Sequence, residues 1–187
     1  SRESSSGNKI EYYYDNDGYL IEEHSYEDES NKNVITYINN YLGKPVTKTM
    51  YVKAKDVYGN EITNGQELPL VTTYSYDKNG NILTISTPSI STSNNIIYDS
   101  ITTTYSYDNL DRVITESTPD KDEYGSDTIN SKITEYDWQG NVIKTTDALN
   151  RISIYVYNKR GFLEKVIDSK QSVTAYYYDR MGRIVAE

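Results

Sequence analysis

One six-residue pattern recurs along the whole chain and constrains its fold more than any other feature. It is spelled YDWQGN at Tyr136–Asn141 and YDKNGN at Tyr76–Asn81. We number the pattern from position 0, the tyrosine, so that position 1 is the acid or amide and position 4 is the glycine. A catalytic motif usually occurs once, where the chemistry is, whereas a motif that recurs at intervals indicates a repeated structural unit.

Eight copies of the pattern can be aligned, and two of their positions are nearly constant in residue type. Position 0 is Tyr14, Asn39, Lys55, Tyr76, Tyr107, Tyr136, Tyr157 and Tyr178. Position 1 is Asp15, Asn40, Asp56, Asp77, Asp108, Asp137, Asn158 and Asp179. Position 4 is Gly18, Gly43, Gly59, Gly80, Asp111, Gly140, Gly161 and Gly182. Seven of the ten glycines stand in this one slot, so the slot needs a property of glycine.

The order Asx-x-x-Gly is typical of a type I turn that ends in a left-handed (αL) residue. Asp or Asn at the first turn position bonds forward to the turn amides, and glycine at the fourth adopts positive φ. Asp111, the one exception, belongs to a residue type that tolerates this conformation. A type I turn followed by an αL residue makes a three-residue hairpin loop with a G1 bulge. Each copy is therefore predicted to be a hairpin turn.

The residues on either side of the turns alternate as they do in β-strands. Before the turn, tyrosines alternate with other residues, as in Tyr155 and Tyr157, and period two places both rings on one face of a strand. After the turn, two aliphatic residues such as Ile82-Leu83 begin a second strand. Three gaps between copies are 21 residues long, which suits two short strands and two turns. The segment Asp147–Arg151 repeats the turn pattern with asparagine in the αL slot and is predicted to be a return turn.

A single hairpin is marginally stable in water, so repeated hairpins are expected to pair edge to edge and bury a shared face. The sequence predicts an all-β fold of tandem antiparallel β-hairpin repeats that form a curled, open β-ribbon over residues 9–187, with about eight copies. Residues 1–8 are predicted to be a linker or remnant outside the fold. Polar insertions near 86–100 and 119–132 are predicted to be loops. The chain begins and ends in mid-pattern, as expected of a piece of a longer protein.

The interior of such a fold must depend on tyrosine, because aliphatic residues are few. Leu, Ile, Val and Phe total 39 of 187 residues, whereas tyrosine alone contributes 21. Tyrosine buries a large ring while its hydroxyl remains at a wet edge. We therefore predict a thin interior rich in tyrosine, into which the rings of the Tyr-x-Tyr pairs point.

Charge and composition exclude several classes of partner and chemistry. The net charge of -9 argues against a nucleic acid or an anionic membrane as partner. No apolar run approaches the roughly 20 residues that a membrane span needs. Cysteine is absent, which excludes disulfides and thiolate chemistry.

The repeat resembles the YD repeat of RHS (rearrangement hot spot) proteins. YDRMGRIV and YDWQGNVI match it closely, and TTDALNRISIYVYNKRGFL looks like the segment between two repeats. The resemblance covers residues 11–187. The family includes bacterial polymorphic toxins, the shell subunits of insecticidal Tc toxin complexes and the teneurin adhesion proteins of animals, in which YD repeats spiral into a hollow β-shell. In the bacterial members this shell encloses a C-terminal toxic domain.

The resemblance implies a structural role. The chain is expected to be a non-catalytic segment of a β-shell that encapsulates or displays part of a larger bacterial protein, secreted or at the cell surface. Its expected partners are the rest of the same polypeptide, including further repeats and a C-terminal toxin domain. A complete shell needs more than eight repeats, and the family's C-terminal core motif with its DPxGL ending is missing. No catalytic residue, cofactor or metal is therefore carried over.

Several residues suggest other chemistry, but each has a plain structural interpretation. His24, the only histidine, has no accompanying nucleophile elbow, and we predict a surface strand or loop residue. Asp15–Gly18 looks like the start of an EF-hand loop, but Tyr13 and His24 would then stand at its first and twelfth positions. Asp120–Gly125 has a tyrosine where an oxygen ligand belongs, so a solvated loop is expected and calcium remains an alternative. Among 28 acidic residues, some pair will have the spacing of a glycosidase by chance.

The aromatic residues leave one binding alternative open. Tyrosine ladders stack either against sugar rings or against neighbouring hairpins, and the low aliphatic content favours the latter. Trp138 stands in a turn, where packing does not require it, and is the candidate ligand contact. The alternative function is therefore a repeat module that binds carbohydrate or a cell surface through exposed aromatics.

Overall fold

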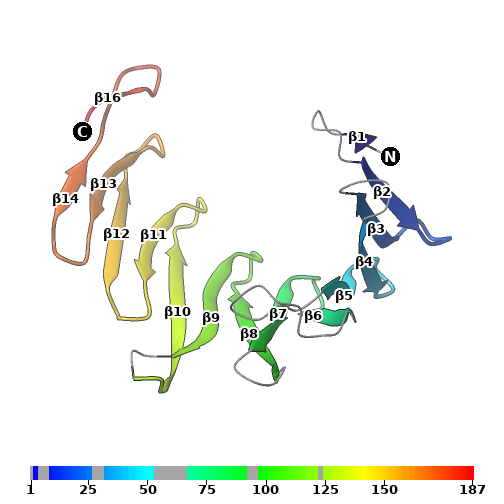
Figure 1. The fold of residues 1–187 in the computed structure, drawn as a ribbon. Helices are drawn as coiled ribbons and strands as arrows, with labels where there is room; N and C mark the ends of the chain where they lie inside the picture. Colours follow the sequence, from blue (N-terminus) through cyan, green and yellow to red (C-terminus); the bar gives the residue numbers. More distant parts are fainter. Residues whose placement is uncertain (1, 4–8, 27–31, 53–66, 92–96, 122–123) are drawn as a thin grey trace. The chain divides into compact units, whose positions relative to one another are not determined.

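The computed structural model describes residues 2–3, 9–26, 32–52, 67–91, 97–121 and 124–187, and among them all regular structure is β (Figure 1). The strands are β1 (Arg2–Glu3), β2 (Lys9–Tyr14), β3 (Leu20–Tyr26), β4 (Lys32–Asn39), β5 (Pro45–Val52), β6 (Leu68–Tyr76), β7 (Ile82–Ser91), β8 (Ile97–Tyr107), β9 (Val113–Lys121), β10 (Asp127–Tyr136), β11 (Val142–Thr146), β12 (Ile152–Tyr157), β13 (Leu163–Ile167), β14 (Val173–Ala175), β15 (Tyr177–Tyr178) and β16 (Ile184–Ala186). Within these residues, no helix is long and apolar enough to cross a bilayer.

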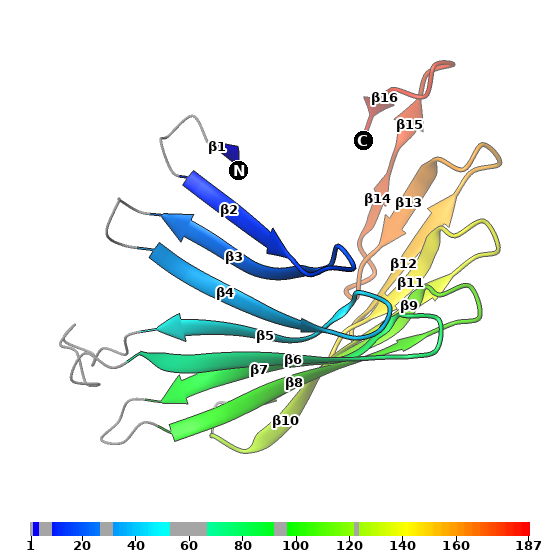
Figure 2. The same cartoon turned by 90° about the vertical axis from the view of Figure 1, so that its right-hand side faces the viewer.

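The strands follow one another in space in the order of the sequence, each antiparallel to the next. The chain divides into two compact units, Ser1–Thr102 and Thr103–Glu187. The first holds β1 to β7 and the start of β8, and the second holds the rest of β8 and β9 to β14, while β15 and β16 form a separate pair. In the first unit the strand direction rotates gradually from β2 to β6, as the twist of paired strands requires (Figure 2). The all-β, open array of antiparallel hairpins is the fold that the sequence predicts.

The repeated pattern forms the turns of seven hairpins, which are β2–β3, β4–β5, β6–β7, β8–β9, β10–β11, β12–β13 and β15–β16. In every one the register shifts by one residue at position 0, as a bulge requires. Position 4 has positive φ throughout, between 75° and 94° at the glycines and 59° at Asp111. Within each unit these turns lie at one end of the strands, and in the second unit the connections β11–β12 and β13–β14 lie at the other end (Figures 1 and 2).

The eighth copy, at Lys55, Asp56 and Gly59, lies outside the described residues. Its flanking strands β5 and β6 pair with each other over six residues, from Thr47↔Thr73 to Val52↔Leu68.

Three segments differ from the sequence expectation. Residues 119–121 and 127–132 are not a loop but the far ends of β9 and β10, which remain paired as far as Lys121↔Asp127. Residues 86–91 and 97–100 likewise belong to β7 and β8. Arg2 and Glu3, expected to lie outside the fold, pair with Ile10 and Lys9. Polar residues extend these strands because antiparallel strands tolerate water on their faces.

The predicted tyrosine-rich interior is a half-buried face rather than a core. Burial alternates at every residue of β12, with Tyr155 and Tyr157 half-buried and Ile154 and Val156 on the more exposed face. Among the residues whose burial is described, His24 alone is buried, and none is exposed by less than 2%. A thin sheet without a covering layer accounts for this, since each face packs only against its own neighbouring side chains.

The turn geometry predicts how position 4 responds to substitution. Gly140 has φ of 94°, and a Cβ placed there meets only the Arg112 guanidinium at 4.0 Å. Gly140→Val should lower the free energy of unfolding by about 1 kcal/mol or more, because a β-branched residue resists the αL conformation. Gly140→Asn should be mild. Equal denaturation midpoints for the two variants would contradict the turn assignment.

Candidate functional site

The Asx side chain at position 1 organises each turn. In nine turns its Oδ1 accepts hydrogen bonds from the backbone amides of positions 3 and 5, at 2.8–3.1 Å. The amide of position 4 donates to the carbonyl of position 1, which is the type I bond. These turns begin at Asp15, Asn40, Asp77, Asp108, Asp137, Asp147, Asn158, Asp168 and Asp179.

Two of the nine are return turns. Asp147 begins the one expected from the sequence, with Asn150 at φ 58°. Asp168 begins one that sequence reasoning missed, with Gln171 at φ 66° in the αL slot. Asp168 follows Asp147 by 21 residues, the same repeat length as the main pattern, and that spacing was the available signal.

Within the second unit, the residue at position 0 joins three hairpins to the hairpin before them. The hydroxyls of Tyr136, Tyr157 and Tyr178 donate to the backbone carbonyls of Val113, Val142 and Leu163, at 2.9, 3.0 and 2.8 Å. Each acceptor is position 6 of the preceding hairpin. These bonds connect backbones that belong to different copies, so the motif tyrosine is a joint between hairpins.

The joint is also present in the first unit, where it explains an irregular copy. Tyr76 donates to the carbonyl of Pro45 at 2.7 Å. Asn39, which stands where most copies have tyrosine, donates from Nδ2 to the carbonyl of Leu20 at 2.8 Å. Both acceptors are again position 6 of the preceding turn. The shared property of position 0 is thus a side-chain donor that reaches the neighbouring backbone.

A second joint is made by position 5, whose side chain covers the glycine of the next described hairpin at Gly43, Gly80 and Gly182. Phe162 lies 2.7 Å from where a Cβ of Gly182 would stand, and its ring lies 5.0 Å from that of Tyr178. The Arg112 guanidinium lies 4.6 Å above the ring of Tyr136 and donates from Nη1 to the carbonyl of Asp137 at 2.9 Å.

The first unit repeats this arrangement. The ring of Tyr19 lies where a Cβ of Gly43 would stand, and Lys44 reaches the carbonyl of Gly80. Glycine at position 4 is therefore required twice at such turns, once for positive φ and once for the close approach of a neighbouring side chain.

Three of the turn carboxylates, those of Asp108, Asp137 and Asp179, have a lowered pKa, which favours their ionised form. The side chain of Arg112 keeps the pKa of Asp108 below its ordinary value, and the Asn141 side chain does so for Asp137. For Asp179 the main cause of the lowered pKa is the backbone amide of Arg183. Hydrogen bonds to the charged form stabilise it, so these aspartates act as fixed acceptors and not as proton donors.

Positions 2 and 3 form the tips of the turns and point into solvent. The Trp138 side chain is 86% exposed, as expected for the candidate ligand contact, and Met181 is 81% exposed at the β15–β16 turn. Leu110 is 67% exposed at the β8–β9 turn. Type I turns accept most residues at these two positions, so folding does not account for the large apolar side chains there.

The prediction that His24 lies at the surface is wrong. His24 lies in β3, but it is buried at 8% exposure rather than on the surface. Its Nε2 lies 2.9 Å from a carboxylate oxygen of Glu22, and its ring packs 4.5 Å from that of Tyr13. Glu11, the cross-strand partner of His24, has its pKa lowered to about 2 by hydrogen bonds from Lys9, Tyr26 and Tyr13. Glu22 therefore gives Nε2 a polar neighbour, whereas the buried Nδ1 has no hydrogen-bond partner among the described residues.

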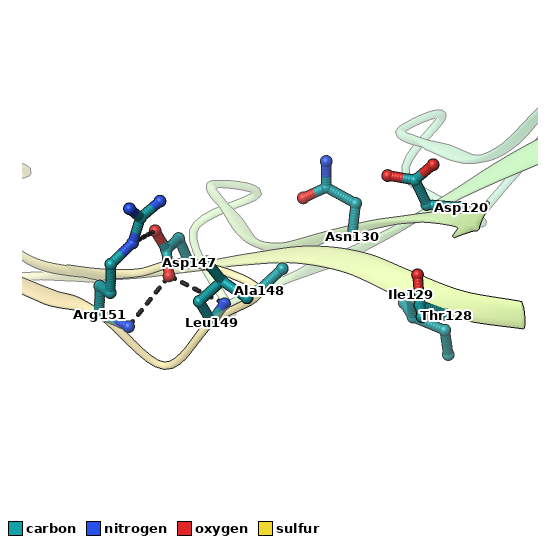
Figure 3. A pocket seen from close by; sticks show the side chains of 8 residues that line it. All are labelled: Asp120, Thr128, Ile129, Asn130, Asp147, Ala148, Leu149 and Arg151. Atoms are coloured by element: carbon teal, nitrogen blue, oxygen red, sulfur yellow. Dashed lines mark hydrogen bonds and ion pairs between the residues drawn. The ribbon is translucent and has the colours of Figure 1, made fainter. Parts of the chain in front are cut away.

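The pocket in Figure 3 lies at the return turns of the second unit, in a volume of about 480 Å³. Asp147 and Arg151, which form an ion pair at 2.6 Å, stand at one end and Asp120 at the other. The backbone amide of Arg151 lowers the pKa of Asp147, which is the wrong direction for the proton donor of a glycosidase. No group of three or more His, Cys, Asp or Glu side chains in the described ranges is placed to hold a metal ion.

No family model matches the chain, and no curated protein is similar to it. Among solved structures, the chain is similar to one of the Photorhabdus luminescens Tc holotoxin pore, at 16% identity and a TM-score of 0.35 over 97% of this chain. It is also similar to the TcdB2-TccC3-TEV structure, at 16% identity and 0.38 over 97%, and to TcdB2-TccC3-Cdc42, at 17% and 0.34 over 95%. The chain spans 12% of the length of each. These are structures of Tc toxin proteins, a group named by the sequence resemblance; at such identities and TM-scores they assign no residue role here.

The covering of glycine by position 5 is testable at two matched turns. Gly18 and Gly43 both have positive φ, at 85° and 75°, but only Gly43 is covered, by Tyr19. Gly18→Asn should change the free energy of unfolding by less than about 0.5 kcal/mol, since asparagine tolerates αL. Gly43→Asn should cost roughly 1–3 kcal/mol through overpacking.

A double-mutant cycle with Tyr19→Ala separates the two effects. Removal of the ring should recover part of the Gly43→Asn loss and leave Gly18→Asn unchanged, as measured by urea denaturation. Absence of coupling between Tyr19 and Gly43 would contradict the covering contact.

The lowered pKa values predict a weaker fold in acid. Asp137 has a folded-state pKa below 3.8, so its contribution is complete above that pH and is lost as the pH falls through the folded value. Asp137→Asn retains the Oδ1 acceptor, as Asn40 and Asn158 do naturally, but cannot be protonated. We expect a nearly unchanged denaturation midpoint at neutral pH and a smaller loss below about pH 4. An acid loss identical to that of the unmodified chain would exclude this role for the carboxylate.

Proposed function

We propose that this chain is a non-catalytic structural segment of YD/RHS type, which forms part of a β-shell wall. The wall would encapsulate or display part of a larger toxin-like bacterial protein that is secreted or held at the cell surface. Its partners would be further repeats of the same polypeptide and the part that they enclose.

The observation that carries this proposal is the joint between hairpins. Position 0 bonds to position 6 of the preceding described hairpin at five places, and the donor is a side chain in each. Such bonds do not stabilise a single hairpin. They connect neighbouring hairpins and so hold a row of hairpins at fixed spacing. The recurring residues at positions 0, 1, 4 and 5 are thus all used in building and joining turns.

The thinness of the array supports a wall rather than a globular enzyme domain. A domain usually closes a core between two layers, which is where a catalytic pocket is formed. In the described part of this chain no side chain is fully buried, and both faces remain open to further contacts. A wall needs only lateral cohesion, which the strand pairing and the joints provide.

The alternative of a carbohydrate-binding module has one observation in its favour, the exposed ring of Trp138. The pocket of Figure 3 and its neighbours in the second unit are lined by residues of the return turns, such as Leu149 and Lys170, at the other end of the strands. We therefore place the structural role first.

The proposal predicts that loosening the joints exposes what the wall encloses. In the natural polypeptide that carries this segment, Tyr136→Phe with Tyr157→Phe removes two hydroxyl joints, each with a stabilisation of about 1 kcal/mol. Limited proteolysis should then cleave the enclosed part faster than in the unmodified protein. Tyr155→Phe, on the same face of β12 but without this bond, is the control and should leave the cleavage rate unchanged.

Two results would contradict the structural role. One is a natural polypeptide in which no further part is protected from protease before any change is made. The other is an equal cleavage rate for the joint variant and the control.

A further inference from the structure

The tips of the turns in the second unit carry side chains that, apart from Arg160, do not build or join the turns. Each turn is built by the side chain of position 1 and the αL residue at position 4, and is joined to its neighbours through positions 0, 5 and 6. Positions 2 and 3 are left to solvent. The residue types at positions 2 and 3 are therefore explained by a function other than folding.

The residues at these tips are apolar, cationic or neutral and polar, and none is acidic. In the hairpins β8–β9, β10–β11, β12–β13 and β15–β16 they are Asn109, Leu110, Trp138, Gln139, Lys159, Arg160, Arg180 and Met181. We call these eight residues the tip surface. It has three large apolar side chains, all of them exposed, and three cations.

Contacts between turns hold neighbouring tips side by side. The Arg112 guanidinium joins the first two turns through the carbonyl of Asp137, at 2.9 Å. The hydroxyl of Tyr157 joins the second and third through the carbonyl of Val142, at 3.0 Å. Arg160 donates from Nη2 to the carbonyl of Arg180 at 2.9 Å and so joins the third and fourth. The apolar and cationic side chains are thus presented together along one edge.

The four turns carry five cations and four carboxylates, Asp108, Asp111, Asp137 and Asp179, so this edge has a small net positive charge whereas the whole chain is acidic. Asp108 and Asp179 form ion pairs with Arg112 and Arg183, at 2.6 and 2.7 Å. Asp137 stands at position 1, behind the tip, and its carboxylate accepts bonds from the turn amides. The three cations of the tip surface form no ion pair with a described residue, and Arg160 is bonded only to a neutral carbonyl.

The net charge of -9 is therefore a poor guide to what this edge attracts. Charges more than about 8–10 Å away are screened at physiological ionic strength, so an approaching surface responds to the tips themselves.

We propose that the tip surface docks on a lipid bilayer that contains anionic phospholipids. Leu110, Trp138 and Met181 would enter the interfacial region, where tryptophan rings are favoured. Lys159, Arg160 and Arg180 would lie against the headgroup phosphates. Protruding tips suit a flat, deformable partner, and three pockets of the second unit lie at the return turns, away from the tips. This inference goes beyond the shell role and does not depend on it.

The sequence offers a direct reporter of this contact, since Trp138 is its only tryptophan. Vesicles of phosphatidylcholine mixed with phosphatidylglycerol should shift its fluorescence emission to the blue at low salt. Vesicles of phosphatidylcholine alone should shift it little, and roughly 0.5 M salt should reverse the effect. Inorganic phosphate at the same ionic strength should leave the emission unchanged, which separates a bilayer from a free anion.

Charge variants test the electrostatic part in vesicle co-sedimentation. Each cation removed should weaken binding about fivefold, so Lys159→Gln with Arg180→Gln should weaken it by roughly 25-fold. This pair leaves the Arg160 bond donor in place, and an unchanged thermal midpoint would show that the fold is intact. Lys170→Gln, a cation of a return turn, is the matched control and should bind as the unmodified chain does.

Three results would overturn the proposal. They are no emission shift with either kind of vesicle, an equal shift with both, and equal binding of the tip variant and the Lys170→Gln control. A shift produced by soluble oligosaccharides and not by vesicles would also overturn it and would assign Trp138 to carbohydrate binding.

Discussion

The left-handed residue that ends each turn is the constraint on which the rest of the structure depends. It allows the chain to reverse within three residues and creates the bulge that sets the register of the following strand. Glycine meets this need without strain, and Asp111, Asn150 and Gln171 show that other residues are accepted where the turn is otherwise well made. Because the turns share one geometry, successive hairpins within a unit present the same atoms to their neighbours, and a single donor at position 0 joins them at five places.

The sequence predicted the conformation of each turn from neighbouring residues. It did not predict the contacts that a residue makes with another copy of the motif. Positive φ at Asp111 and Asn150 follows from turn chemistry within five residues. The bond from Tyr157 to the Val142 carbonyl could not be inferred, because it depends on how two hairpins lie against each other. His24 was expected at the surface since nothing in the sequence shows that Tyr13 and Glu22 surround it. The segment 119–132, which the sequence predicts to be a loop, is mostly strand in its described part. Its polar residues suggest a loop, but they do not prevent strand pairing.

Different positions of the motif have different roles, and this difference links the fold to the proposed functions. Positions 0, 1, 4 and 5 build and join the turns, and the described part of the sheet has no fully buried side chain. An array of this kind gains cohesion sideways, from hairpin to hairpin, which suits a wall. The side chains at positions 2 and 3 do not build the turns. Such a wall can therefore use them to contact its surroundings. Trp138 and Arg160 occupy that place in the second unit.

The central claim is that the backbone at position 4 is left-handed. It can be tested by comparing the stability of the protein with D-alanine and with L-alanine at one such position. Gly161 has φ of 80°, with no atom within 4 Å of an added L-Cβ. Semisynthesis would place D-alanine or L-alanine there, and urea denaturation would give the free energy of unfolding of each. D-alanine should be more stable than glycine by up to about 1 kcal/mol, because it restricts the unfolded chain and favours positive φ. L-alanine should be less stable by about 1 kcal/mol. Equal stability of the two alanine forms, or the reverse order, would contradict the account.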